Sequence, residues 1–182
     1  MNPLETERGW DGKDLQVRTL YDMNVFAEKE ASTHLDILHY YWSSLQIEKD
    51  GLPKISEFHP GEFLPDAGKC KIGWIDSSAE DPNDFVMRDH PDNLIQGFGR
   101  ELSGKVLAEF PSKMHAKSLM LEHLRCKRWK VPLYREIDQV INGIGRHYTR
   151  LMVPLVDETG TVTRIYYGVY PLVPPTPMSI AD

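Results

Sequence analysis

The sequence of 182 residues has only two cysteines, Cys70 and Cys126, and neither belongs to a Cys-x-x-Cys motif. This scarcity argues against a disulfide framework and against a structural zinc site, which needs four closely spaced ligands. No hydrophobic run approaches the roughly 18 residues of a membrane-spanning helix. The N-terminus, Met1–Arg8, is polar and lacks the basic and apolar regions of a secretion signal. We therefore expect a cytoplasmic protein without a membrane span.

The chain also lacks the excess of positive charge that binding to a nucleic-acid backbone requires. Its formal net charge is −6, so we expect no nucleic-acid partner. The 41% hydrophobic and 26% charged content is that of a globular protein with one domain. Basic residues nevertheless gather in one segment, as the solvated face of a helix or a docking face for an acidic partner; they are Lys113, Lys117, Arg125, Lys127, Arg128 and Lys130.

Hydrophobic periodicity predicts two amphipathic helices. The first covers residues 32–49, where Ser32 or Thr33 can cap the helix and apolar residues recur at steps of three and four. Its apolar side is a candidate dimer interface, with packing onto the chain's own domain as the alternative; the residues are Leu35, Leu38, Tyr41, Trp42 and Leu45. The second helix covers residues 112–127, and its apolar stripe contains Ala116, Leu119, Met120, His123 and Leu124.

Five strands are predicted from β-branched and aromatic runs that turn residues separate. They cover residues 71–76, 84–88, 133–141, 146–156 and 161–172. The first two form a hairpin, and the last three form a meander with turns at Asn142-Gly143 and Thr159-Gly160. Pro154 predicts a bulge or a strand end. The order of elements predicts an α+β fold, with a five-stranded antiparallel sheet that helices cover on one face.

The predicted domain covers residues 32–172. Residues 1–31 show no clear period and form an N-terminal extension, part of which can be helical. Residues 173–182 are rich in proline and cannot continue a sheet, so we expect a flexible C-terminal tail. The stretch Gly97–Lys105 contains three glycines and predicts the bend where the first strands lead into short helices that enclose a pocket.

These elements and their order resemble the PAS fold, and specifically a family of small stand-alone bacterial PAS-like proteins, mostly alphaproteobacterial, that is catalogued as of unknown function. The resemblance spans Leu35–Leu172. The sequence departs from the family pattern at His90-Pro91-Asp92, in the region where the family usually has a Gly-Thr pair. The residues that carry the resemblance are Tyr41-Trp42, Leu52-Pro53, Ile55, Pro60, Leu64-Pro65, Phe85–Arg88, Phe98–Gly104, Val153-Pro154-Leu155, Asp157 and Gly160.

The resemblance implies a non-enzymatic sensory or protein-interaction module of bacterial signalling, often a homodimer, with a protein or a small metabolite as partner. PAS relatives bind haem, flavin, metabolites or no ligand. The candidate pocket mixes aromatic area with a few polar groups, as ligand cavities do, with a fully packed core as the alternative. Its residues are Trp74, Phe85, Met87, Phe98, Leu119, Met120, His123, Tyr148 and Tyr166.

We expect no cofactor, no metal and no catalytic residue. The haem alternative uses His123 on the longer helix as the ligand, although a histidine on an apolar face is more often a core residue. Flavin photochemistry would need a cysteine on a short helix after the second strand, which neither Cys70 nor Cys126 provides. A further alternative is a small α+β enzyme with a cone-shaped pocket, which would need Asp138 or His147 to face inward.

Overall fold

The computed structural model describes residues 2–30, 33–49, 51–63, 72–90, 101–110, 112–174 and 176–177. The strands are β1 (Glu5–Trp10), β2 (Leu15–Tyr21), β3 (Ile72–Asp76), β4 (Val86–Asp89), β5 (Leu133–Ile141), β6 (Ile144–Val156), β7 (Val162–Pro171) and β8 (Thr176–Pro177). The α-helices are α1 (Met23–Lys29), α2 (His34–Lys49), α3 (Pro60–Phe63) and α5 (Lys113–Trp129), and the short 3₁₀ helices are η1 (Ile55–Glu57), η2 (Pro82–Asp84) and η3 (Leu107–Glu109).

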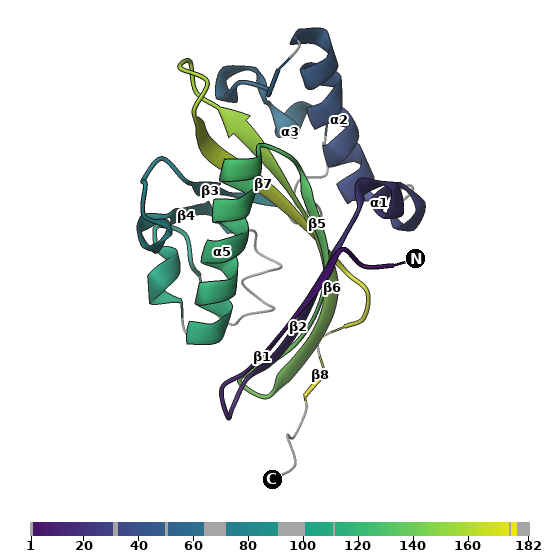
Figure 1. Cartoon of the computed structure of the whole chain (residues 1–182), viewed down its shortest axis with the longest axis vertical. Coiled ribbons are helices and arrows are strands. Elements are labelled where there is room, and N and C mark those ends of the chain that lie inside the picture. The colour runs from purple at the N-terminus through teal and green to yellow at the C-terminus, as the bar shows by residue number, and fades with distance from the viewer. Residues whose placement is uncertain are drawn as a thin grey trace.

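The strands form one antiparallel sheet in the order β1-β2-β5-β6-β7-β3-β4 (Figure 1). The five predicted strands make up its part β5-β6-β7-β3-β4, so the PAS-like α+β fold predicted from the sequence is confirmed. The turn between β5 and β6 has positive φ angles of 52° at Asn142 and 74° at Gly143, as a two-residue hairpin turn requires. The strand irregularity expected near Pro154 lies between Leu155 and Val156, where the register with β7 shifts.

The N-terminal segment differs from the irregular, partly helical extension that its sequence suggests. Residues 5–21 form the hairpin β1–β2, which extends the sheet beside β5, and only α1 is helical. The β2 side chains that face the interior include Gln16 and Arg18, which are 2% and 1% exposed. Because polar residues occupy these inward positions, the apolar alternation that identifies a strand is missing from β2.

Two described residues of the C-terminal tail form a short strand despite the proline content of the segment. Thr176 and Pro177 form β8 and pair with Gly145 and Ile144 at the start of β6, so the prediction of a flexible tail is wrong for these two residues. Proline is compatible with this position because β8 pairs with one strand only.

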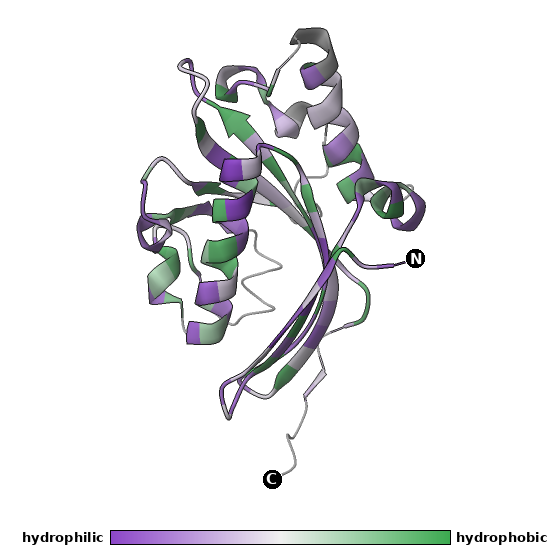
Figure 2. Ribbon diagram, viewed as in Figure 1, coloured by the Kyte–Doolittle hydropathy of each residue, from purple (hydrophilic) through white to green (hydrophobic). Residues whose placement is uncertain are grey.

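Helices lie on both faces of the sheet (Figure 1). The prediction that helices cover one face only is therefore wrong. Helix α5 packs with η2 and η3 on one face, whereas α1 and α2 pack on the other face. Alternation along β5 shows the two sides, because Ile137 belongs to the core beneath α5 and Tyr134 to the core beneath α2. Figure 2 shows the upper end of β6 as hydrophobic, whereas hydrophilic residues are spread through the lower strands.

Helix α2 uses its apolar side within the chain, so the structure does not support the dimer interface expected from it. Leu35, Leu38, Tyr41 and Trp42 are at most 5% exposed and pack against the sheet, and Leu45 is partly buried against the same core. The Nε1 of Trp42 donates a hydrogen bond to the carbonyl oxygen of Pro154 (2.8 Å). Large residues of the outward side of α2 are Ile37 and Tyr40, which are 43% and 73% exposed.

Helix α5 begins as predicted, with Ser112 as its N-cap. The Ser112 side chain accepts a hydrogen bond from the backbone N–H of His115. Residues 97–100 of the glycine-rich stretch lie outside the described residues, and Gly104 lies in a turn with a φ of +81°. Within the described ranges, no helix combines the length and apolar character that crossing a membrane requires.

Replacing Leu38 with alanine should lower the free energy of unfolding by about 2–5 kcal/mol, because the substitution leaves a cavity in the core beneath α2. Replacing the neighbouring Ile37, on the exposed side of α2, with alanine should change the free energy of unfolding by less than about 0.5 kcal/mol. Urea unfolding followed by circular dichroism measures both. Equal effects of the two substitutions would contradict the orientation of α2.

Candidate functional site

On the face of the sheet that α5 covers, charged residues gather on the strands near the N-terminal hairpin β1–β2. Pairing between strands places Glu5 beside Leu20, Leu20 beside Arg135, and Arg135 beside Arg150. Two residues further along the same pair of strands, Glu7 lies beside Arg18. These residues come from β1, β2, β5 and β6, so sheet pairing alone brings together charges that are far apart in the sequence.

We call Arg18, Arg135, Arg150 and Glu122 the arginine cluster. Glu122 comes from α5, and all four residues are at most 4% exposed. Oε1 of Glu122 lies 2.9 Å from Nη1 of Arg18 and 2.8 Å from Nε of Arg135. Nη2 of Arg150 contacts Oε2 of the same carboxylate. One buried carboxylate therefore faces three buried guanidinium groups.

Carboxylates at the edge of the cluster are already engaged by a fourth arginine. Arg125 Nη1 donates hydrogen bonds to Glu5 (2.8 Å) and Glu7 (2.9 Å). The hydrogen bond from Arg125 is the main cause that holds the pKa of Glu5 below its usual value. Arg135 Nη2 is farther from these carboxylates, at 3.6 Å from Glu7 and 3.9 Å from Glu5. The interior of the cluster therefore keeps an excess of positive charge.

Within the described residues, Arg18 has one polar contact, its ion pair with Glu122. Its Nη1 lies close to Glu122, but none of its three guanidinium nitrogens makes a hydrogen bond within the described part of the chain. Burial lowers the pKa of Arg18 to about 10, so the side chain is still cationic at neutral pH. A buried cation without hydrogen bonds is energetically costly and would be stabilised by an additional acceptor.

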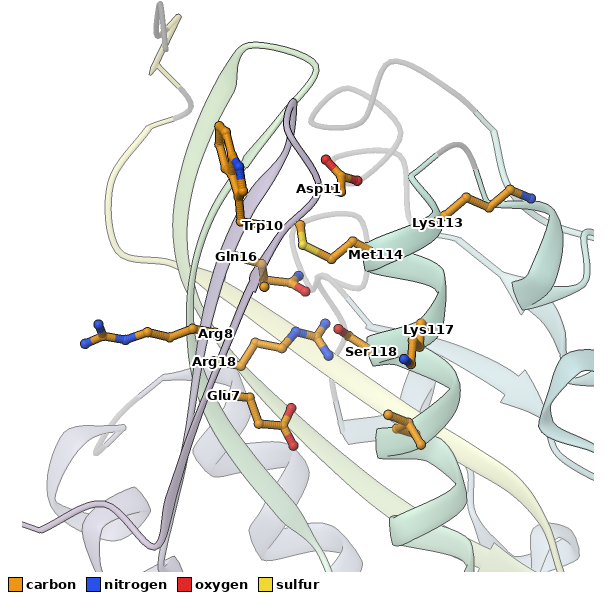
Figure 3. Close-up of a pocket in the computed structure, with 12 residues that line it drawn as sticks. Glu7, Arg8, Trp10, Asp11, Gln16, Arg18, Lys113, Met114, Lys117 and Ser118 are labelled. Atoms are coloured by element: carbon orange, nitrogen blue, oxygen red, sulfur yellow. The ribbon is translucent and has the colours of Figure 1, made fainter. Parts of the chain in front are cut away.

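A pocket of about 410 Å³ lies next to Arg18, between the hairpin β1–β2 and the N-terminal half of α5. In Figure 3 the guanidinium group of Arg18 points toward α5 and Ser118, whereas Arg8 points away from the helix. A Cβ on Gly9 would lie 2.6 Å from Sδ of Met114, so glycine at this position lets Met114 approach the strand closely. The pocket therefore combines a buried cation with an apolar wall.

A neutral polar network borders this pocket. Nε2 of Gln16 donates a hydrogen bond to Oε1 of Gln139 (2.8 Å) and lies 3.2 Å from Nδ1 of His115. Burial, followed by the nearby Arg18 and Arg150, holds the pKa of His115 well below its usual value. His115 is therefore neutral at pH 7, and the network adds no charge that would neutralise the arginine cluster.

The structure does not bring the nine predicted pocket residues together. Phe85, Met87, Leu119 and Tyr148 belong to the core beneath α5, and Met120 packs against it. Trp74 and Tyr166 pair across β3 and β7 but face the α2 side of the sheet. Successive residues of a strand point to opposite faces, so a single pocket cannot contain both sets. Phe98 lies outside the described residues.

His123, the remaining predicted pocket residue and the candidate haem ligand, is buried on α5. Its Nδ1 lies 2.8 Å from the carbonyl oxygen of Leu119, one turn earlier in the helix. Its Nε2 has no hydrogen-bond partner among the described residues. Burial lowers the pKa of His123 from 6.5 to about 4. His123 does not line the pocket beside Arg18.

The residues considered for catalysis lie apart from this pocket. Asp138 and His147 are on the opposite side of the sheet from α5, with 62% and 31% exposed side chains and 3.8 Å between Oδ1 and Nδ1. His147 also contacts Glu136 (2.9 Å). Cys126 is buried, and burial raises the pKa of its thiol. Across the described ranges, no group of three metal-ligating side chains is present.

The basic residues of α5 divide between contacts within the chain and the pocket. Arg125 pairs with β1, and Lys127 donates hydrogen bonds to the carbonyl oxygens of Ser77 and Ala79. Lys113 and Lys117 line the pocket beside Arg18. Part of the predicted docking face for an acidic partner therefore meets carboxylates and carbonyl groups of the chain itself.

Sequence reasoning missed the arginine cluster. One signal was available, because Arg135 alternates with the inward residues Leu133 and Ile137, and Arg150 alternates with Tyr148 and Met152. A charged residue at an inward strand position predicts a buried charge that needs a partner. Nothing in the sequence identifies Glu122 as that partner, because Glu122 lies on α5 and approaches the strands only when the chain folds.

Comparisons with known proteins concern the fold alone. The chain is similar to the PAS domain of BvgS from Bordetella pertussis, with 20% identity, a TM-score of 0.46 and coverage of 57% of this chain and 76% of that domain. It is also similar to a variant of Vivid, with 15% identity, a TM-score of 0.44 and coverage of 74% of this chain and 99% of that chain. No family model and no curated protein sequence match it.

Replacing Glu122 with glutamine should lower the free energy of unfolding by about 3–5 kcal/mol, because three buried guanidinium groups lose their shared carboxylate. Chemical denaturation measures the change. The same substitution at Glu109, which is exposed on η3, is the matched control and should have an effect below about 0.5 kcal/mol. A Glu122 variant as stable as the control would contradict the burial of this ion cluster.

The low pKa of His123 predicts a pH dependence of stability. The unfolded chain binds a proton below pH 6.5 that the folded chain binds only near pH 4, so acidification through this window favours unfolding. Unfolding measured between pH 7 and pH 4 should show a loss about 3 kcal/mol smaller in His123→Gln than in the unchanged protein. Protonation of His115 lowers the stability of both proteins equally, so it cancels when the two stability losses are subtracted. Identical pH profiles would show that His123 is accessible to protons in the folded state.

Proposed function

We propose that this protein is a non-enzymatic PAS-like sensory module that binds a small molecule between the hairpin β1–β2 and α5. The observation that supports this proposal is the pocket of about 410 Å³ that the buried side chain of Arg18 helps to line. Its volume is within the range of ligand sites, and its lining combines apolar surface with charged and polar side chains. A fold alone does not identify a function, so the proposal depends on this pocket.

A sensory role also agrees with the resemblance of the chain to PAS-fold proteins. The pocket lies where the hairpin β1–β2 meets α5, so a bound molecule would contact two elements that join the sheet from different parts of the chain. Occupation of the pocket would alter the packing of α5 on the sheet, which offers a route from ligand to a protein partner. Membership of the small stand-alone bacterial family and homodimer formation are further parts of the proposal.

Two alternatives have specific observations in their favour. A haem sensor would use Nε2 of His123, which has no hydrogen-bond partner among the described residues. An enzyme would use the outward pair Asp138 and His147, which border a second pocket on the other face of the sheet. The pocket beside Arg18 includes neither group, so it supports binding over catalysis.

Native mass spectrometry and absorption spectroscopy test the proposal. The protein, incubated with a low-molecular-mass extract of bacterial cells, should take up a small molecule and show no visible absorption band. Ser118→Leu should reduce the amount of added mass, because Ser118 lines the pocket and the larger leucine side chain would narrow it. Ser56→Leu, on an exposed residue far from the pocket, is the control and should retain it.

The same spectra distinguish the alternatives. A Soret band that is lost in His123→Ala would favour the haem sensor. Failure of the unchanged protein to bind any molecule, or equal binding by Ser118→Leu and the unchanged protein, would contradict the proposed pocket. The mass of the intact assembly reports whether the protein is a homodimer.

A further inference from the structure

We infer that the ligand of the pocket beside Arg18 is a small organic carboxylate, whose carboxylate group binds the Arg18 guanidinium and whose apolar part lies against Met114 and Gly9. This inference rests on the proposed function and names the chemical class of the ligand. It depends on three observations, namely the hydrogen-bonding state of Arg18, the charge of the cluster behind it, and the composition of the pocket wall.

Arg18 presents a built anion site. It is 1% exposed and lines the pocket, and its guanidinium nitrogens make no hydrogen bond within the described residues. Its Nη1 forms an ion pair with Oε1 of Glu122 at 2.9 Å, whereas its Nε and Nη2 make no hydrogen bond within the described residues. A carboxylate that entered the pocket could accept two parallel N–H bonds from this planar group.

The surrounding charges favour an anion. Glu122 is shared among three guanidinium groups, and Glu5 and Glu7 are engaged by Arg125. Positive charge in the interior therefore exceeds negative charge, and burial of uncompensated charge is costly. A bound anion would neutralise part of this excess. Lys113 and Lys117 line the same pocket and would attract an anion to its entrance.

The single buried cation of the pocket lining favours a carboxylate over a phosphate, because the other three cations of the lining, Arg8, Lys113 and Lys117, are exposed to solvent. Arg18 is the only member of the arginine cluster that lines the pocket, whereas Arg135 and Arg150 do not line it. One guanidinium group matches the single charge and planar shape of a carboxylate. Oδ1 of Asp11, which also lines the pocket, accepts hydrogen bonds from the backbone N–H groups of Lys13 and Asp14, and this carboxylate would repel a dianion more strongly than a monoanion.

The part of the pocket wall that Gly9, Met114 and Leu121 form is compatible with an apolar molecular body. Met114 lies against β1 at Gly9, where any side chain would displace it, and Leu121 of α5 lines the same pocket. Thioether and aliphatic groups offer dispersion contacts but no hydrogen-bond partners. A ligand with a carboxylate at one end and an aliphatic or aromatic body would use both parts of the site.

Titration with matched acids and amides tests the inference. The probes are phenylacetate and hexanoate, their neutral counterparts phenylacetamide and hexanamide, and inorganic phosphate. Binding is followed by calorimetry and by the ¹H–¹⁵N signal of the arginine Nε–H groups in the full-length protein. At least one carboxylate should bind saturably and shift the Arg18 signal, and its amide should bind at least about tenfold more weakly.

Two arginine variants separate the site from general charge effects. Arg18→Gln should weaken carboxylate binding about tenfold to a hundredfold, whereas Arg128→Gln should change it less than about twofold, because Arg128 is exposed on α5 and does not line the pocket. Both variants remove one positive charge. If Arg18→Gln does not fold, Arg18→Lys keeps the charge but loses the planar pair of donors, and should also bind more weakly.

Other outcomes would overturn the inference. These are equal binding of acid and amide, tighter binding of phosphate, no binding of either acid, or equal effects of Arg18→Gln and Arg128→Gln. A neutral molecule that binds the unchanged protein and Arg18→Gln alike, but not Ser118→Leu, would refute the carboxylate while leaving the proposed function intact. Failure of every molecule, neutral or charged, to bind the unchanged protein would refute both.

Discussion

The ionic contact between Glu122 and three arginines is the constraint on which much of the remaining structure depends. It joins α5 to β2, β5 and β6 within the interior. Apolar surfaces tolerate small shifts, but a buried charge that loses its partner is strongly destabilising. The contact therefore fixes the position of α5 along the sheet. It also fixes where the helix and the hairpin β1–β2 leave a pocket between them.

The hairpin β1–β2 adds two strands to the five-stranded part of the sheet, on the side of β5. It pairs with β5, supplies Arg18 to the interior, and places Glu5 and Glu7 against Arg125 of α5. The N-terminal segment is therefore part of the domain and of the proposed site. This arrangement explains why the pocket that best supports a binding function lies beside the hairpin and not among the nine residues expected from the sequence.

Local sequence signals were sufficient where short-range chemistry decides the structure. Ser112 caps α5, Asn142 and Gly143 form the turn of the central hairpin, and the apolar residues of α2 face the sheet. Signals failed where polar residues occupy inward positions. Strand β2 was missed because strand prediction relies on apolar residues at the inward positions, which Gln16 and Arg18 occupy in β2. The polar partners of these two residues, Gln139 and Glu122, come from β5 and α5.

The sequence by itself determined the α+β class, the positions of α2, α5 and five strands, and the turns between them, because these follow from periodicity and from residues close in the chain. Only the tertiary structure decided which residues share a face. Trp74 and Tyr166 pack on the side of the sheet opposite Met87. Arg18, Glu122 and Arg150 meet because strand register and helix packing bring distant positions together, and long-range pairing leaves no local trace in the sequence.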